Sequence, residues 1–190
     1  MVVPVLDSGA SAALGYAEES GVPYETALIR NHFVQRTFIE PTQSIRAFRV
    51  RVKHNVVKGF FEGKRVLLVD DSIVRGTTLR KIVQLVREGG AAEVHLRISS
   101  PPTVGPCHYG INTPTREELI AHNHTPQEIS EVMGADTLEY LPVEVLRKLS
   151  ETHIKHGICD ACFSDEYPVP IDSEFGTPQL SLFRQLEEDE

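Results

Sequence analysis

The sequence has 190 residues, of which 41% are hydrophobic and 24% charged, and its formal net charge is −8. This length and composition suit one soluble domain with a sizeable core. The acidic balance argues against nucleic-acid binding as the main function, so any phosphate binding must come from a local site. No apolar run approaches the roughly 18 residues of a membrane span, and no secretory signal opens the chain. We therefore expect a cytoplasmic protein.

The first third of the chain predicts a strand over residues 2–5, a helix over 11–20 that stops at Gly21, and a strand over 24–30. Residues 31–58 have weak periodicity and are predicted to form a long loop. A loop of this length inside a compact domain is usually functional.

The middle of the chain predicts a strand over residues 64–70, a helix over 77–88 and a strand over 93–99. This strand–helix–strand order indicates a right-handed crossover and a parallel sheet, which places the chain in the α/β class with helices flanking the sheet. The apolar face expected for the helix consists of Leu79, Ile82, Val83 and Val86.

Capping boxes mark two further helix starts, Thr115 with Glu118 and Thr125 with Glu128. A last helix is predicted over residues 142–149, after which acidic residues and prolines become frequent. The expected organisation is a domain over residues 1–150, a cysteine-containing segment over 151–163 and a mobile tail over 164–190, whose composition disfavours a packed core. These last three ranges are predictions from composition and motif position alone.

The most informative motif is VLLVDDSIVRGTT, from Val66 to Thr78. A buried strand ends on two adjacent carboxylates, Asp70 and Asp71, and a short turn leads into a helix. Backbone N–H groups at such a turn bind anions, Gly76 allows close approach, and the following threonines add hydroxyl donors. Paired carboxylates beside a phosphate site suit a sugar diol, a divalent metal or both. The motif predicts a pocket for a phosphorylated sugar, the alternative being an ordinary polar turn.

A second turn, Asp7-Ser8-Gly9, also follows a strand and precedes a helix, so it is a candidate anion-binding nest. The nucleotide-binding patterns GxxxxGK[ST] and GxGxxG are absent from the sequence. On its own, the short turn is as compatible with a structural role.

The three cysteines are Cys107, Cys159 and Cys162, an odd number that includes one CxxC. In a cytosolic protein this favours metal or redox chemistry over a disulfide framework. With His153 and His156, the CxxC repeats every third residue, a pattern compatible with structural zinc. Inert thiols are the other alternative.

VDDSIVRGTT resembles the phosphoribosyl-pyrophosphate (PRPP) motif of the type I phosphoribosyltransferases, and its wording is similar to that of the amidophosphoribosyltransferase family. The similarity continues, in order, over roughly residues 2–163. The similar segments are VPVLDSG, ALGYAEESG, RTFIEPTQSIR, VHLRISSPP, PCHYGIN and CDAC.

This resemblance implies a type I phosphoribosyltransferase fold that is truncated at its N-terminus and lacks the glutaminase domain. It implies that Asp70 and Asp71 are catalytic, facing the ribose hydroxyls and Mg²⁺, with Ser8 as a further Mg²⁺ ligand. The residue pattern departs from the family at Leu6, where proline is usual. The implied PRPP-binding residues are Asp7, Ser8, Gly9, Arg30, Arg36, Ser72, Val74, Arg75, Gly76, Thr77 and Thr78.

The implied reaction is displacement of pyrophosphate from C1 of PRPP by ammonia, giving 5-phosphoribosylamine at the start of purine synthesis. Ammonia comes from glutamine in the complete enzyme, which is expected to be a homo-oligomer, and residues 30–46 form a lid over PRPP. Some family members also carry a [4Fe–4S] cluster, whose ligands match Cys107, Cys159 and Cys162 here plus one cysteine that this chain lacks.

Three alternative functions remain open. The chain could be another phosphoribosyltransferase that acts on a nucleobase, or a PRPP-sensing regulator on the same fold. It could also be a small metal-binding interaction module built around residues 153–162, although that hypothesis leaves the carboxylate motif unexplained.

Overall fold

The computed structural model describes residues 1–30, 54–56, 59–154 and 157–171. Its centre is a four-stranded sheet in the order β1-β4-β5-β6, and all neighbouring strands are parallel. The strands are β1 (Val2–Pro4), β4 (Arg65–Asp70), β5 (Glu93–Ile98) and β6 (Thr137–Tyr140). The predicted α/β class with a mostly parallel sheet is therefore confirmed.

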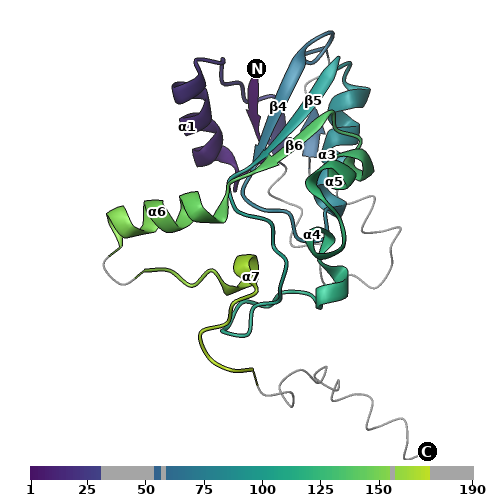
Figure 1. The fold of residues 1–190 in the computed structure, drawn as a ribbon. Coiled ribbons are helices and arrows are strands. Elements are labelled where there is room, and N and C mark those ends of the chain that lie inside the picture. Colours follow the sequence, from purple (N-terminus) through teal and green to yellow (C-terminus); the bar gives the residue numbers. More distant parts are fainter. Residues whose placement is uncertain (31–53, 57–58, 155–156, 172–190) are drawn as a thin grey trace, which may run out of the picture.

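Helices cover both faces of this sheet (Figure 1). On one face, α1 (Ala10–Ser20) packs against β1 and β4. On the other face lie α3 (Thr77–Glu88) and α5 (Pro126–Met133), which also contact each other. Because side chains alternate along a strand, β4 contributes Val66 and Leu68 to the larger core beneath α3 and Val69 to the smaller core beneath α1.

The crossover helix α3 begins and ends at the predicted residues, and its four predicted apolar residues are all buried. The predicted stop of α1 is also confirmed, since Gly21 caps this helix in the left-handed conformation with φ +68°. Glycine adopts this conformation without the steric cost that a Cβ would bring.

Smaller elements complete the described part of the chain. A separate antiparallel pair joins β2 (Leu28–Arg30) to β3 (His54–Val56). Beyond the sheet lie the 3₁₀ helix η2 (Arg116–Glu118) and the short helix α4 (Ile120–Asn123). Towards the C-terminus, α6 (Val143–His153) is followed by α7 (Ala161–Ser164). None of the described helices has the length and apolar character that a membrane span requires.

The structure differs from the sequence prediction at several elements, among them α6, which runs to His153 instead of ending at Leu149, and α7, which was not predicted. The helix predicted from Thr115 is instead a 3₁₀ turn that breaks at Leu119, because that side chain is fully buried and its backbone is extended. The strand predicted over residues 24–30 is only β2, with Tyr24 forming an isolated bridge to Val2. Strand β6 was not predicted; it has four residues, and pairing with β5 determines its conformation.

Candidate functional site

The two anion-binding turns predicted from sequence meet at the carboxyl edge of the sheet. One follows β1 and the other follows β4, and these strands are hydrogen-bonded neighbours with Pro4 opposite Val69. The hydroxyl of Ser8 donates a hydrogen bond of 3.2 Å to Oδ1 of Asp70. Ligands of open α/β sheets bind at this edge, so the structure brings the two turns together where a ligand is expected.

Asp70 is the most unusual titratable group of this edge. It is 9% exposed, and its Oδ1 also accepts the backbone N–H of Asp71 at 2.9 Å. Burial, with a further contribution from the charge of Asp71, raises the pKa of Asp70 to about 7. A buried carboxylate of this kind is costly to ionise unless a cation compensates it.

The neighbouring carboxylate, Asp71, is exposed, and its Oδ1 accepts the backbone N–H of Ser72 at 2.7 Å. With Asp70 and the Ser8 hydroxyl, it presents oxygen ligands from two turns on one edge of the sheet. Oxygen donors, carboxylates above all, are the ligands that Mg²⁺ prefers.

The turn after β4 is held at several points. We call residues 72–78, which are predicted to bind phosphate, the phosphate turn. Ile73 is buried in the main core, and the carbonyl of Val74 accepts the N–H of Ile120 at 3.0 Å. The guanidinium of Arg75 bonds to Oε1 of Glu118, with Nε at 3.0 Å and Nη2 at 2.8 Å. The phosphate turn is therefore fixed from one side by the segment around η2.

Gly76 sits just before α3 with φ +72°, a conformation that favours glycine. A Cβ on Gly76 would also lie 2.1 Å from Cε of Met133. Thr77 and Thr78 follow in the first turn of α3, and both are exposed. Their hydroxyls and the N-terminal amides of the helix are thus accessible donors for an anion.

The first turn depends on a close backbone approach at Gly9. Its N–H donates to the carbonyl of Val5 at 2.9 Å, and a Cβ at this position would lie 2.2 Å from the carbonyl oxygen of Val69. Asp7 and Ser8 are exposed, and the Leu6–Asp7 peptide bond is cis. Glycine is thus required at residue 9 by the packing of the turn against β4.

Most of the predicted lid residues lie outside the described part of the chain. Arg30 is the last residue of β2, and its side chain is not among those described. Arg36 and the rest of the predicted lid up to Arg46 lie outside the described residues. Their assignment to PRPP stays a prediction.

The three cysteines come from two segments that pack together. The backbone carbonyl of Cys162 accepts the N–H groups of Val104 and Gly105. Burial raises the pKa of Cys162, and the nearby Cys107 and Cys159 add to the shift. In the part of the chain that the structure describes, no group of three or more histidine, cysteine or acidic side chains is arranged as a metal site.

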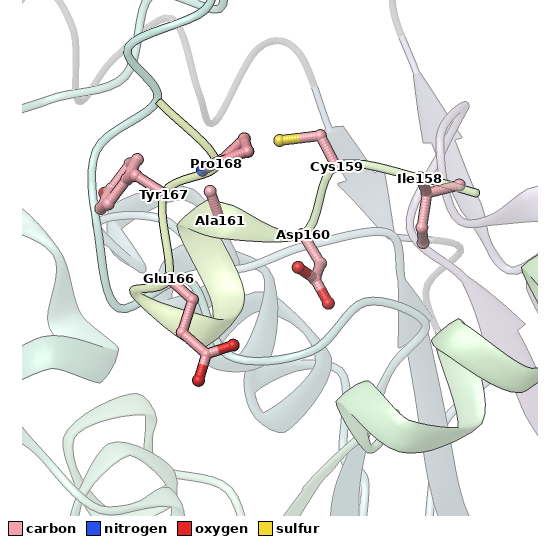
Figure 2. Close-up of a pocket in the computed structure, with 7 residues that line it drawn as sticks. All are labelled: Ile158, Cys159, Asp160, Ala161, Glu166, Tyr167 and Pro168. Atoms are coloured by element: carbon pink, nitrogen blue, oxygen red, sulfur yellow. The ribbon is translucent and has the colours of Figure 1, made fainter. Parts of the chain in front are cut away.

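A pocket of about 220 Å³ opens beside Cys159. Figure 2 shows the residues that line it. One wall is Asp160, which forms an ion pair with Arg147 of α6. Another is Tyr167, whose hydroxyl donates to the carbonyl of Pro106 at 2.7 Å and whose ring contacts that of His108. The pocket lies in the cysteine region and contains none of the residues predicted to bind PRPP. Its lining is Ile158, Cys159, Asp160, Ala161, Glu166, Tyr167 and Pro168.

Two residues at the site were not singled out from sequence for the roles they have here. Glu118 was identified only as a cap, yet it also holds Arg75. Ser99 supports the strand end, since its N–H and hydroxyl both donate to the carbonyl of Asp70. The capping box signalled the position of Glu118, but no local pattern indicated its partner, which lies 43 residues away.

Two loops that meet at the carboxyl edge of a parallel sheet, one of them with paired carboxylates, form the arrangement expected of a phosphoribosyltransferase. Residues 1–99 match the model of the phosphoribosyl transferase domain, and the chain belongs to this family. Within the family, the chain resembles the amidophosphoribosyltransferases. It is 52% identical over 185 residues to the Bacillus subtilis enzyme, covering 95% of this chain, and 51% identical over 182 residues to the chloroplastic enzyme of Vigna aconitifolia, covering 96%.

Solved structures of related enzymes also resemble this chain. The B. subtilis glutamine PRPP amidotransferase, complexed with ADP and GMP, has a TM-score of 0.79 at 53% identity over 91% of this chain. A second structure, described as the allosteric regulatory enzyme of purine biosynthesis, has a TM-score of 0.80 over 92%. These matches confirm the type I phosphoribosyltransferase fold. The chain spans only 37% to 39% of the length of the proteins in these matches.

Proposed function

We propose that this chain is the phosphoribosyl-transfer unit of an amidophosphoribosyltransferase. It binds PRPP with Mg²⁺ and replaces the pyrophosphate at C1 with ammonia, the first committed step of purine synthesis. The hydrogen bond between Ser8 and Asp70 carries this proposal, because it joins the turn expected to bind pyrophosphate to the carboxylates expected to bind ribose.

The phosphate turn receives the 5′-phosphate of PRPP. Its support comes from the exposed Thr77 and Thr78 at the start of α3 and from the left-handed Gly76 before them. The amides of a helix N-terminus and adjacent hydroxyls bind phosphate without a bulk positive charge, which this acidic chain lacks. Backbone amides of residues 7–9 then hold the pyrophosphate on the neighbouring strand end.

Asp70, Asp71 and Ser8 fit Mg²⁺, since their donors are oxygens and the buried Asp70 carboxylate has its pKa raised to about 7. When bound, Mg²⁺ supplies charge neutralisation for the departing pyrophosphate. The carboxylates position the ribose hydroxyls and stabilise the positive charge that develops on the ring. This is preorganised electrostatic stabilisation on a rigid strand end.

The chemical step is a displacement with inversion. The lone pair of ammonia forms the new C1–N bond, the bond from C1 to the pyrophosphate oxygen breaks, and its electron pair leaves with pyrophosphate. The ammonium product then releases a proton to solvent. No protein base is needed, because free ammonia already carries its lone pair. Water competes at C1, so the lid predicted for residues 30–46 serves to exclude it.

The cysteines do not complete the cluster that the family resemblance suggests. A [4Fe–4S] cluster of this type takes four thiolates, and the sequence contains three cysteines. This chain therefore supplies at most three of the four ligands, and we propose a cluster only for a complete protein that adds the fourth cysteine. The reaction above requires none. All three are free thiols, which suits a reducing compartment, and we propose a cytoplasmic location.

We propose glutamine use and homo-oligomer formation only for a complete protein that contains a glutaminase. The direct test for the chain is pyrophosphate release from PRPP at rising ammonia concentration. We expect release that needs both Mg²⁺ and ammonia and that Asp71→Asn abolishes. PRPP binding without release would favour a regulator, and release that depends on a nucleobase would favour a different transferase.

A further inference from the structure

The 3₁₀ helix η2 contacts two regions of different expected function. On one side, Glu118 bonds to Arg75 of the phosphate turn, with distances of 3.0 Å to Nε and 2.8 Å to Nη2. On the other side, the guanidinium of Arg116 donates to both carboxylate oxygens of Asp165, at 2.7 Å and 2.6 Å. Asp165 directly follows α7, the helix that contains Cys162.

The carboxylate of Glu118 serves two partners at once. Oε1 bonds to Arg75, while Oε2 accepts the backbone N–H of Thr115 at 3.2 Å and so completes the capping box of η2. A change in the position of η2 therefore moves the acceptor that holds Arg75. A capping box links side chain and backbone reciprocally, so the Glu118 carboxylate is held at the start of η2.

The residues that follow η2 are also anchored, in the core and to the phosphate turn. Leu119 is fully buried, and the N–H of Ile120 donates to the carbonyl of Val74 at 3.0 Å. The segment beyond α7 is tied to the preceding loop by the hydroxyl of Tyr167, which donates to the carbonyl of Pro106. Described contacts thus run from Asp165, through η2, to Val74 and Arg75.

We propose that η2 is a brace that couples the order of residues 157–171 to the conformation of the phosphate turn, with Glu118 and Arg116 as positioning residues. The identity of the ligand rests on the proposed function, whereas the coupling itself does not. Displacing residues 157–171 shifts η2 through Arg116 and so makes the phosphate turn less ordered. Removing the charge of Glu118 breaks the link between η2 and the phosphate turn, so that such a displacement no longer affects the phosphate turn. Neither residue needs to touch substrate.

The ligand-free test is hydrogen exchange at the backbone amides of residues 72–76. Glutamine at residue 118 keeps an acceptor for Thr115 but removes the charge that holds Arg75. We expect Glu118→Gln and Asp165→Asn each to speed exchange about threefold, the size expected for a half-exposed ion pair. Glu117→Gln is the matched control, because it removes a charge from the same turn and its side chain bonds to Thr115.

A double-variant cycle tests the coupling directly. In the Glu118→Gln background, Asp165→Asn should have little further effect on exchange in the turn, since both act along one series of contacts. The two substitutions could instead have additive effects on the exchange rates, or either single variant could leave exchange unchanged. Each of these results would disprove the coupling through η2, even if the chain binds PRPP.

Calorimetry then separates positioning from loss of structure. Ribose 5-phosphate, which needs the phosphate turn, should bind Glu118→Gln about threefold more weakly, while pyrophosphate, expected at residues 7–9, should bind unchanged. Equal weakening of both ligands would contradict a positioning role. Absence of binding by the wild-type chain would overturn the proposed ligand, but the exchange result would still decide the coupling.

Discussion

The side chains of Ser8 and Asp70 are hydrogen-bonded at 3.2 Å, although 62 residues separate them in the sequence. The contact forms because the two residues follow β1 and β4, which are adjacent and parallel. It joins the two halves of the candidate PRPP site before any ligand is bound. A site assembled in this way needs little rearrangement to bind a doubly anchored substrate.

Asp70→Asn should stabilise the ligand-free chain and abolish Mg²⁺-dependent PRPP binding. The pKa of Asp70 is raised from 3.8 to about 7, so the folded chain retains a proton that the unfolded chain loses between about pH 4 and 7. Stability therefore falls as the pH rises through this interval, and asparagine removes the fall. We expect a gain of about 2–4 kcal/mol in the free energy of unfolding at pH 8, measured by urea denaturation.

Asp71→Asn is the matched control for this stability effect. Asp71 is exposed, so its substitution should change the free energy of unfolding by less than about 0.5 kcal/mol. Both variants should lose Mg²⁺-dependent binding. Asp70→Asn could instead prove as neutral to stability as Asp71→Asn. This result would disprove the conclusion that burial makes ionisation of Asp70 unfavourable in the folded chain.

The pH dependence of binding should follow the same group. Mg²⁺ needs the ionised carboxylate of Asp70, so the affinity for PRPP with Mg²⁺ should weaken as the pH falls below about 7. The measurement is calorimetric titration between about pH 5.5 and 8.5 at constant ionic strength. An affinity that stays flat across this range would show that Asp70 does not bind the metal as a carboxylate.

Gly9→Ala should destabilise the chain and displace the first turn. The added Cβ would lie 2.2 Å from the carbonyl oxygen of Val69, which is backbone and cannot move aside cheaply. We expect a loss of at least about 2 kcal/mol in the free energy of unfolding, by the cost typical of overpacking. Gly15→Ala is the control: it lies in α1 with open space around it and should stabilise by about 1 kcal/mol.

Chelation tests the alternative of a metal-dependent module. The main core consists of apolar side chains from the sheet, α3 and α5, so the fold should persist without transition metals. Circular dichroism and the melting temperature should be unchanged after treatment with a zinc and iron chelator, while PRPP binding still responds to added Mg²⁺. Unfolding on chelation would instead favour a zinc module around residues 153–162.

Much of this site was predictable because its signals are local. The run ending at Asp70 and Asp71 specifies a buried strand, a turn and a helix, and all three occur at the expected residues. The apolar period of α3 identified four buried side chains correctly. Here hydrophobic pattern, glycine position and helix start agree with one another, and such agreement makes a prediction reliable.

The remaining features depend on tertiary contacts that no local pattern encodes. Strand β6 is only four residues long and acquires its conformation from β5, and Leu119 interrupts a predicted helix because its side chain is buried. The pairing of Glu118 with Arg75 joins distant segments. The burial that raises the pKa of Asp70 likewise arises from packing rather than from the sequence around it.

The most direct test of the central claim is calorimetric titration of the chain with PRPP, with and without Mg²⁺, beside the Asp70→Asn/Asp71→Asn double variant. The account predicts binding by the wild-type chain that requires Mg²⁺ and that the double variant loses while remaining folded. Binding that is unaffected by Mg²⁺ and by the double substitution, or no binding by a demonstrably folded wild-type chain, would contradict the assignment of the carboxylate edge as the PRPP site.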